Sequence, residues 1–274
     1  MSPYEYHEFV AVAAKKLRGG GVCGYWDEVI VSTVVVDKRE ARIRRMFGHI
    51  APSYDFLNHL LSLNIDRWWR RKTTQLVPPI GSAPILDLCT GTGDLALAYD
   101  RAAQGRVPIV GADFCPEMLR LAEIKASRAK ATERLRFLEA DAQRLPFPDD
   151  EFQITTVAFG LRNVTDTDKG LAEMVRVTRP GGKVAILEFS QPRGWLFGRL
   201  YRFYFRNVLP LIGQVISRSQ DNAYRYLPAS VLEFPDGEAL AERLRRHGLI
   251  DVRFHPFTFG IATLYVGTKP PLAA

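Results

Sequence analysis

The sequence predicts an α/β fold, a doubly wound seven-stranded sheet that is mostly parallel with an antiparallel last strand. Two observations predict it. Strand-like apolar runs alternate with helix-like segments from residue 85 to residue 189, which is typical of a parallel sheet with helices on both faces. Two further strand-like runs lie a few residues apart near the C-terminus, a spacing that favours antiparallel pairing.

The chain before the sheet divides into two parts. Residues 1–38 are expected to form an N-terminal extension of unknown order, because their one β-branched run, "VIVSTVVV", stands isolated. The domain is expected at 39–270. Helical periodicity from 39 to 77 predicts a helical N-terminal cap, and the stiff linker "VPPIGSAP" separates this cap from the first strand.

The elements of the sheet follow in order. Parallel strands are expected at 85–89, 107–111, 135–139, 152–158 and 183–189. The helices between them are expected at 94–101, 116–130 and 168–178. An aromatic and basic stretch, 192–231, then interrupts the alternation and is expected to form a lid insertion. A helix at 235–247 and strands at 251–257 and 261–268 complete the pattern.

Composition limits the classes of protein. The net charge of +7 is compatible with an anionic partner, nucleic acid or a membrane surface, and equally with an ordinary enzyme. Cys23, Cys89 and Cys115 lack framework spacing, which favours reduced thiols and a cytoplasmic protein. No ladder of histidine and cysteine ligands appears, so no metal is expected. No apolar run approaches the ~20 residues of a membrane-spanning helix, and the N-terminus does not resemble a signal peptide.

The turn after the first strand, in "ILDLCTGTGDLAL", predicts a ligand site. Gly91, Thr92 and Gly93 formally match the glycine pattern of dinucleotide-binding folds. Asp87 and Asp94 flank this turn, and carboxylates there would repel a pyrophosphate and compete for the positive end of the helix. A ligand with positive charge and no phosphate fits better. S-adenosylmethionine, with its sulfonium and ammonium groups, is such a ligand.

Two later strands end in acidic residues that suit the same ligand. Asp113 follows the second strand about twenty residues after the glycines, where a carboxylate can accept the ribose hydroxyl protons. Asp141 follows the third strand and can accept the adenine amino group, while Ala142 leaves room for the ring. Because ligands of open α/β sheets bind at the carboxyl ends of the strands, these residues predict one donor site.

Two further motifs are specific enough to suggest a family. They are "YDFLNHLLSLNIDRWW" at 54–69 and "RVTRPGGKVAILEFS" at 176–190, supported by "FGLRNVTD" and "YRYLPASVLEFPD". With them the chain resembles the ubiquinone/menaquinone biosynthesis C-methyltransferase family, of the class I S-adenosylmethionine-dependent methyltransferases with a Rossmann-like sheet. The resemblance covers about 39–268. Leu57 and Asp66 stand where this family has methionine and histidine, so no role of that histidine is carried over.

The resemblance implies a reaction and its residues. Thr92, Asp113, Asp141 and Ala142 match donor-binding positions, and Ala158 stands where the family often has serine, so only a backbone contact is carried over there. The implied reaction is C-methylation of a demethylated polyprenyl quinol, with demethylmenaquinol to menaquinol as the expected case.

Residues near the acceptor follow from the position of "FGLRN" after the fourth strand. Arg162 is expected to stabilise a phenolate and Asn163 to orient a hydroxyl group, against the alternative that both only shape the turn. Glu188 is a further candidate, and His49 and Tyr54 are candidates for covering the donor.

Residues 195–209, "WLFGRLYRFYFRNVL", have helical spacing with arginines on one side and aromatic residues on the other. This pattern predicts either peripheral association with an anionic membrane or an ordinary lid helix.

Three other functions share some of these sequence features. Nucleic acid is not expected as a partner, because "AFGLRN" replaces the [ND]PP[YF] loop of base-amino methyltransferases. A dinucleotide oxidoreductase rests on the glycine turn alone. A methyltransferase for another small lipophilic or phenolic acceptor stays open, as do the choice of naphthoquinol or benzoquinol, the tail length, the general base and a homo-oligomeric state.

Overall fold

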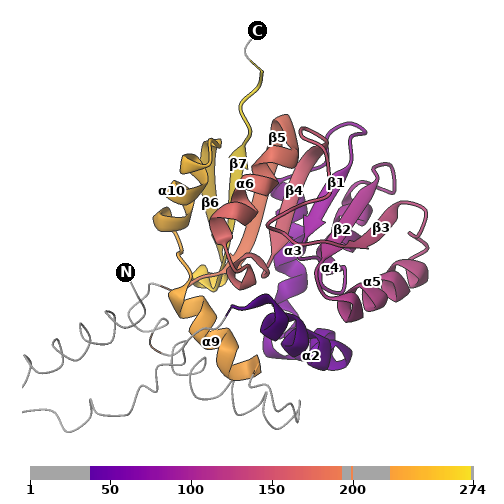
Figure 1. The fold of residues 1–274 in the computed structure, drawn as a ribbon, viewed down its shortest axis with the longest axis vertical. Coiled ribbons are helices and arrows are strands. Elements are labelled where there is room, and N and C mark those ends of the chain that lie inside the picture. The colour runs from indigo at the N-terminus through magenta and orange to yellow at the C-terminus, as the bar shows by residue number, and fades with distance from the viewer. Residues whose placement is uncertain (1–37, 193–198, 200–222, 273–274) are drawn as a thin grey trace, which may run out of the picture. The chain divides into compact units, whose positions relative to one another are not determined.

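A seven-stranded sheet forms the centre of the computed structural model, which describes residues 38–192, 199 and 223–272 (Figure 1). The strand order is β3-β2-β1-β4-β5-β7-β6. The strands are β1 Ile85–Leu88, β2 Ile109–Asp113, β3 Leu135–Glu139, β4 Phe152–Ala158, β5 Thr178–Phe189, β6 Ile250–Phe257 and β7 Ala262–Thr268. The first five strands pair in parallel, and β7 runs antiparallel to both of its neighbours. The predicted fold class is thereby confirmed.

Helices lie on both faces of this sheet and at the carboxyl ends of its strands (Figure 1). They are α2 Glu40–Leu61, α3 Ile65–Leu76, α4 Asp94–Ala102, α5 Pro116–Arg128, α6 Thr167–Val177, α9 Ala223–Glu233 and α10 Glu238–Arg246, with short 3-10 turns η1 Leu161–Asn163 and η3 Thr258–Gly260. Among the described residues, no helix is long and apolar enough to cross a lipid bilayer.

Three apolar clusters hold these layers together. One contains Trp69 of α3 and Tyr99 of α4, and a second contains Leu171 of α6 and Leu244 of α10, each packed with residues of the central strands. The third joins the buried side of α2 to α5 and includes Ile43 and Met118. Strands β1 and β4 are buried along almost their whole length because helices cover both faces.

Most predicted boundaries agree with the structure to within two residues. The main difference is β5, which begins at Thr178 rather than at 183, because Thr178 pairs with Phe152 before the register shifts. The helical cap expected at 39–77 consists of two helices, α2 and α3. Leu63 and Asn64 separate them with φ values of 52° and 61°, a left-handed conformation that ends a helix.

The described residues include only part of the predicted domain limits. The extension 1–38, apart from Lys38, lies outside the described residues. So does most of the predicted insertion 192–231, including all of the amphipathic segment 195–209 except residue 199. These limits therefore stay predictions.

Candidate active site

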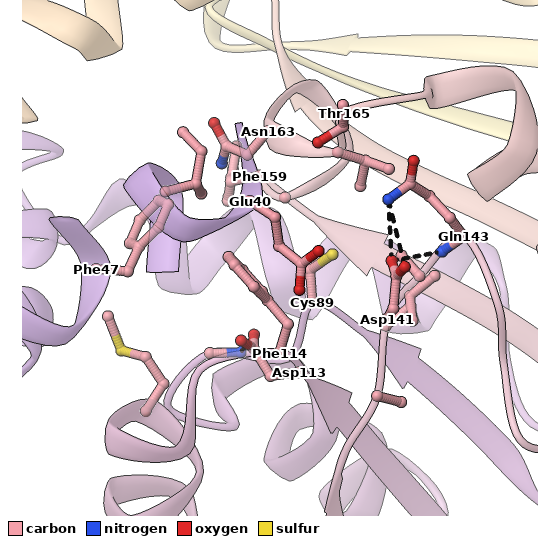
Figure 2. A pocket seen from close by; sticks show the side chains of 18 of the residues that line it. Glu40, Phe47, Cys89, Asp113, Phe114, Asp141, Gln143, Phe159, Asn163 and Thr165 are labelled. Carbon is pink, nitrogen blue, oxygen red and sulfur yellow. Dashed lines mark hydrogen bonds between the residues drawn. The ribbon is translucent and has the colours of Figure 1, made fainter. Parts of the chain in front are cut away.

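A cavity lies at the carboxyl ends of β1, β2 and β4, between the strands and helix α2 (Figure 2). It encloses about 720 Å³ of space, part of it open to solvent. The order of the strands reverses between β1 and β4, and such a switch point is where doubly wound sheets bind their ligands. From α2, Ile43, Phe47 and Tyr54 form the apolar roof of this cavity.

The glycine turn forms the floor of the cavity, and its two glycines serve different purposes. Gly91 has φ 55°, and a Cβ there would lie 4.0 Å from the ring of Tyr54, within the cavity. Gly93 has φ 80°, and a Cβ there would lie 3.1 Å from that of Ala122 on α5. Gly91 thus leaves space for a ligand, whereas Gly93 permits the close packing of α4.

Asp87 lies behind the turn and holds its two ends together. Its Oδ2 accepts hydrogen bonds from Oγ1 of Thr90 at 2.6 Å and from the backbone N–H of Ala96 at 3.1 Å. Burial raises the pKa of Asp87 to about 7, although these bonds act in the opposite direction. Asp87 is not part of the cavity wall, so its contribution to ligand binding passes through the turn.

Asp113 lies at the end of β2 and contacts the turn from the cavity side. Its Oδ2 accepts the N–H of Gly91 at 2.8 Å, and its Oδ1 accepts the N–H of Cys115 at 2.9 Å. Burial raises the pKa of this carboxyl group to about 6, against the effect of the backbone hydrogen bonds. Each carboxylate oxygen has more than one lone pair, so Asp113 retains the capacity to accept ligand hydroxyl groups.

Asp141 and Ala142 form the side of the cavity beyond β3 (Figure 2). Oδ1 of Asp141 accepts from the backbone N–H of Gln143 at 2.9 Å and from Nε2 of the same residue at 3.1 Å. Oε1 of Gln143 in turn accepts the N–H of Asp166 at 3.0 Å. This chain of bonds connects the loop after β3 with the start of α6 and fixes the direction of Asp141.

The predicted site residues fall into two groups. Those on the cavity wall are Gly91, Asp113, Asp141, Ala142, Ala158 and Asn163. Those that lie outside the wall are Asp87, Thr92, Gly93 and Arg162. Of the covering candidates, Tyr54 contributes to the wall, and burial raises its pKa, whereas His49 lies on the exposed side of α2. Residues at the carboxyl ends of β1, β2 and β3 thus lie on the wall of one cavity, whereas their role in donor binding stays a prediction.

Arg162 is buried beside the cavity in an ion pair with Glu188. Its Nη1 lies 2.9 Å from Oε2 of Glu188 and also donates to the backbone carbonyl of Phe159 at 2.5 Å. Only 5% of Arg162 and 1% of Glu188 are exposed. Nε of Arg162 and Oδ1 of the neighbouring Asn163 are buried and find no hydrogen-bond partner among the described residues. These two atoms are therefore an unpaired donor and an unpaired acceptor on consecutive residues.

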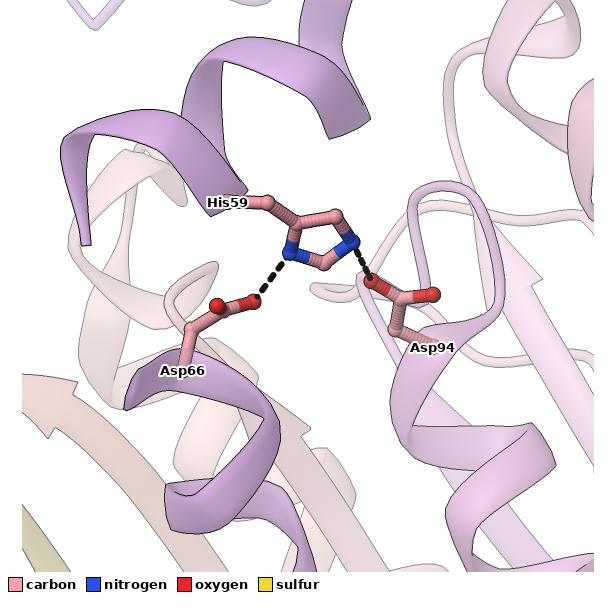
Figure 3. Close-up of side chains that lie close together, drawn as sticks. All are labelled: His59, Asp66 and Asp94. Carbon is pink, nitrogen blue, oxygen red and sulfur yellow. Dashed lines mark hydrogen bonds and ion pairs between the residues drawn. The ribbon is translucent and has the colours of Figure 1, made fainter. Parts of the chain in front are cut away.

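A network of ion pairs lies beneath the glycine turn. His59, Asp66 and Asp94 approach one another closely enough to suggest a metal site (Figure 3). However, Arg70 donates to Asp66 at 2.5 Å, and Lys125 donates to Asp94. These cations neutralise the carboxylates that a metal would need, so the cluster is an ion-pair network.

The network also explains the position of Thr92. Its Oγ1 donates to Oδ1 of Asp55 at 2.5 Å, and Nζ of Lys125 donates to Asp55 at 2.8 Å and to Thr92 at 3.1 Å. Asp94 likewise points to this network. Burial acts to raise the pKa of Asp94, but Arg70 and Lys125 outweigh it, and the pKa is lowered. Thr92 and Asp94 therefore fix helix α2 to the turn, and the negative charge expected at the ligand from Asp94 is absent there.

Replacement of Lys125 by methionine tests this link. We expect a loss of about 1–3 kcal/mol in the free energy of unfolding, because Asp55 and Asp94 lose their common partner while they stay partly buried. Arg120→Met, on the same helix, is the control, because the pair of Arg120 with Glu117 is exposed and contributes less than about 1 kcal/mol. Urea denaturation of both variants measures the difference, and equal effects would contradict the role of Lys125.

Several wall residues were not anticipated from the sequence. Besides Ile43 and Phe47 on α2, they include Glu40, Cys89, Phe114, Gln143 and Thr165. The spacing of Ile43, Phe47 and Tyr54 along one side of a helix was a usable signal for the roof. Glu40 carried no such signal, since it depends on the direction in which α2 crosses the strand ends.

Comparison with known proteins identifies the family. Residues 35–269 match the ubiE/COQ5 methyltransferase family. The ubiquinone/menaquinone biosynthesis C-methyltransferase UbiE of Citrifermentans bemidjiense is 48% identical over 234 residues, which are 85% of this chain and 99% of that protein. The demethylmenaquinone methyltransferase of Thermus thermophilus is 49% identical over 225 residues, 82% of this chain and 100% of that protein.

Solved structures agree on the fold. A methyltransferase of Thermotoga maritima, dependent on S-adenosylmethionine, superposes with a TM-score of 0.59 at 17% identity, over 82% of this chain and 99% of that one. Phosphoethanolamine N-methyltransferase 2 of Haemonchus contortus, in complex with S-adenosylmethionine, gives a TM-score of 0.54 at 16% identity, over 73% and 52%. The resemblance noted in the sequence is confirmed, and the chain belongs to the ubiE/COQ5 methyltransferase family.

Proposed function

We propose that this methyltransferase uses S-adenosylmethionine to methylate a ring carbon of a demethylated polyprenyl quinol, with demethylmenaquinol as the acceptor. The family membership supports the reaction class. The observation that carries the donor site is the convergence of Asp113 and Asp141 on one cavity at the strand ends. Peripheral attachment to an anionic membrane from the cytoplasmic side is part of the proposal, because the acceptor has an apolar tail.

The residues present fit the donor. Gly91 leaves space over the turn, Asp113 has acceptor capacity for the two ribose hydroxyls, and Asp141 can accept the adenine amino group beside the small side chain of Ala142. The backbone of Ala158 contributes at the end of β4. When bound, S-adenosylmethionine supplies an electrophilic methyl group on a sulfonium.

Asn163 and Arg162 are proposed to hold the acceptor hydroxyl. A hydroxyl group can donate to the unpaired Oδ1 of Asn163 and accept from the unpaired Nε of Arg162. A hydrogen bond from a guanidinium favours the deprotonated form of that hydroxyl. The proton leaves to the solvent, to which the cavity is partly open, because an amide oxygen orients the hydroxyl but does not take up its proton. Deprotonation increases the electron density on the ring carbon. Because Glu188 offsets much of the charge of Arg162, the directed hydrogen bond matters more than the net charge.

The enzyme contributes mainly by positioning. Holding two reactants in a reactive geometry lowers a barrier by about 7–11 kcal/mol. The roof of Ile43, Phe47 and Tyr54 places apolar surface above the turn, which would limit the contact of a bound quinol with water. The proposed protein residues therefore orient the acceptor and limit its contact with water.

Two measurements test the proposal. Calorimetric titration with S-adenosylmethionine and with NAD should show binding of the former alone, and binding of NAD would contradict the donor assignment. Deletion of the gene, followed by mass spectrometry of the quinones, should show accumulation of demethylmenaquinone. Accumulation of a demethylated benzoquinone, or an unchanged quinone pool, would show that the acceptor is a different compound.

A further inference from the structure

Large apolar side chains are exposed at one edge of the molecule. They come from helix α2, from the turn that follows it, from helix α3 and from the 3-10 turn η3. Their exposed fractions are 62% for Phe56, 41% for Leu60, 78% for Leu63, 45% for Trp68 and 81% for Phe259. Together these five residues form what we call the apolar edge.

The topology places the turn η3 at the same edge of the sheet as the cavity. Strands β5 and β6 are both antiparallel to β7, so η3, which follows β6, lies at the same edge as the carboxyl ends of the parallel strands. Trp69 of α3 donates through Nε1 to Oγ1 of Thr258 at 2.8 Å, and Trp68 packs edge-to-face on Phe257 at 5.5 Å. Helix α3 is thereby bound to this turn.

Helix α2 presents opposite sides to the cavity and to the apolar edge. Ile43, Phe47 and Tyr54 line the cavity, whereas Phe56 and Leu60, one turn apart, are exposed. A helix with its side chains is about 10 Å thick. The apolar edge is therefore separated from the cavity by little more than one helix.

The charges around the apolar edge are positive. Arg67 and Arg71 are exposed on α3 beside Trp68. Arg45 is exposed on the same side of α2 as Phe56, about 16 Å before it along the helix. Of the three carboxylates of α2 and α3, Asp55 and Asp66 are directed into the ion-pair network with Lys125 and Arg70. The third, Glu40, lies on the cavity wall at the start of α2, about four turns before Phe56. Exposed apolar side chains flanked by arginines are the combination that favours insertion at an anionic lipid surface.

We propose that the apolar edge and these three arginines form the surface that docks on an anionic lipid bilayer. The docked enzyme would have its cavity roof against the membrane, where an apolar acceptor enters without crossing water. The proposed docking rests on the proposed function, which includes attachment to an anionic membrane, and adds to it the surface that makes the contact.

Flotation with vesicles tests the surface directly. The full chain should float with vesicles of phosphatidylcholine and phosphatidylglycerol, and less with phosphatidylcholine alone. The double variant Phe56→Ser/Leu60→Ser should lose roughly tenfold or more in partitioning. The matched control is Ile80→Ser, since Ile80 is 70% exposed but precedes β1 at the opposite edge of the sheet, and it should bind as the wild type does.

A second variant separates charge from folding. Arg45→Gln/Arg67→Gln/Arg71→Gln should abolish the preference for anionic vesicles and leave the melting temperature unchanged.

Wild-type flotation of either variant would overturn the proposal, as would an equal loss in Ile80→Ser. A lower melting temperature of the serine variant without vesicles would mean that these side chains pack within the protein, and conversion of a dimer to a monomer would assign the surface to self-association. Either result also overturns it. Calorimetric titration with S-adenosylmethionine tests the donor site separately, so its result does not depend on whether the variants bind vesicles.

Discussion

Replacing Asp113 with asparagine is expected to weaken the binding of S-adenosylmethionine by about a hundredfold or more. The carboxylate contacts Gly91 and Cys115 and lies on the cavity wall. An amide places an NH₂ group against one of these N–H donors and offers a weaker acceptor to the ribose hydroxyls. Isothermal titration calorimetry at pH 8 measures the loss. A decrease of less than about threefold would contradict the assignment of the ribose to this residue.

The pH dependence of donor affinity provides a second test of Asp113. Its pKa is raised from 3.8 to about 6 by burial, so the free protein takes up a proton on this group as the pH falls through 6. Because ribose binding needs the carboxylate, the affinity should decrease by up to about tenfold per unit below pH 6 and be constant above pH 7. This decrease should be absent from Asp113→Asn.

Stability changes in the opposite direction. A carboxyl group whose pKa is raised on folding contributes stability that is present below pH 4 and is lost as the pH rises through the raised value. For Asp113 this window ends near pH 6, and for Asp87 near pH 7. Asp251→Asn is the control, because Asp251 is an exposed aspartate on β6, and it should alter neither affinity nor its pH profile.

The sheet and the position of Asp113 and Asp141 on the cavity wall were predictable because they depend on local sequence patterns. Strands β3 and β4 have the predicted boundaries. The buried strand β4 reads as an apolar and β-branched run whatever packs against it. Asp113 and Asp141 were identified because a residue directly after a parallel strand must lie at the ligand-binding edge. The family resemblance, which is confirmed, predicts the order of the helices and strands, but it does not predict the direction in which individual side chains point.

Residues in turns were less predictable because their side-chain directions depend on distant partners. Asp94 is the first residue of helix α4 and directly follows the glycine turn in the sequence, but its side chain points to Lys125 of α5 and Arg70 of α3. Thr92 similarly contacts Asp55 of α2. The charge argument from Asp87 and Asp94 therefore led to S-adenosylmethionine although neither residue lies on the cavity wall. The carboxylates that do lie there are Glu40, Asp113 and Asp141.

Removal of Arg162 should have the largest effect on both folding and turnover. In Arg162→Met the carboxylate of Glu188 keeps its burial but loses its ion pair. Loss of one partner of a buried pair costs about 3–5 kcal/mol, which is a large part of the total stability of a domain. We expect a variant that is poorly folded at 37 °C, and chemical denaturation measures the loss.

The double variant Arg162→Met/Glu188→Gln separates folding from chemistry. It removes both buried charges, so it should recover most of the lost free energy of unfolding. Turnover at saturating S-adenosylmethionine should nevertheless remain at least about a hundredfold below wild type, because Asn163 then has no guanidinium neighbour to share the acceptor hydroxyl. Glu188→Gln alone leaves the buried guanidinium without its carboxylate and should also lose stability. The molecules that fold should keep most of the activity, since the guanidinium retains its bond to the carbonyl of Phe159. Wild-type turnover in a folded double variant would restrict Arg162 to a structural role in the turn after β4. Low turnover with intact donor affinity would instead identify the unpaired Nε of Arg162 and Oδ1 of Asn163 as the groups that bind the acceptor.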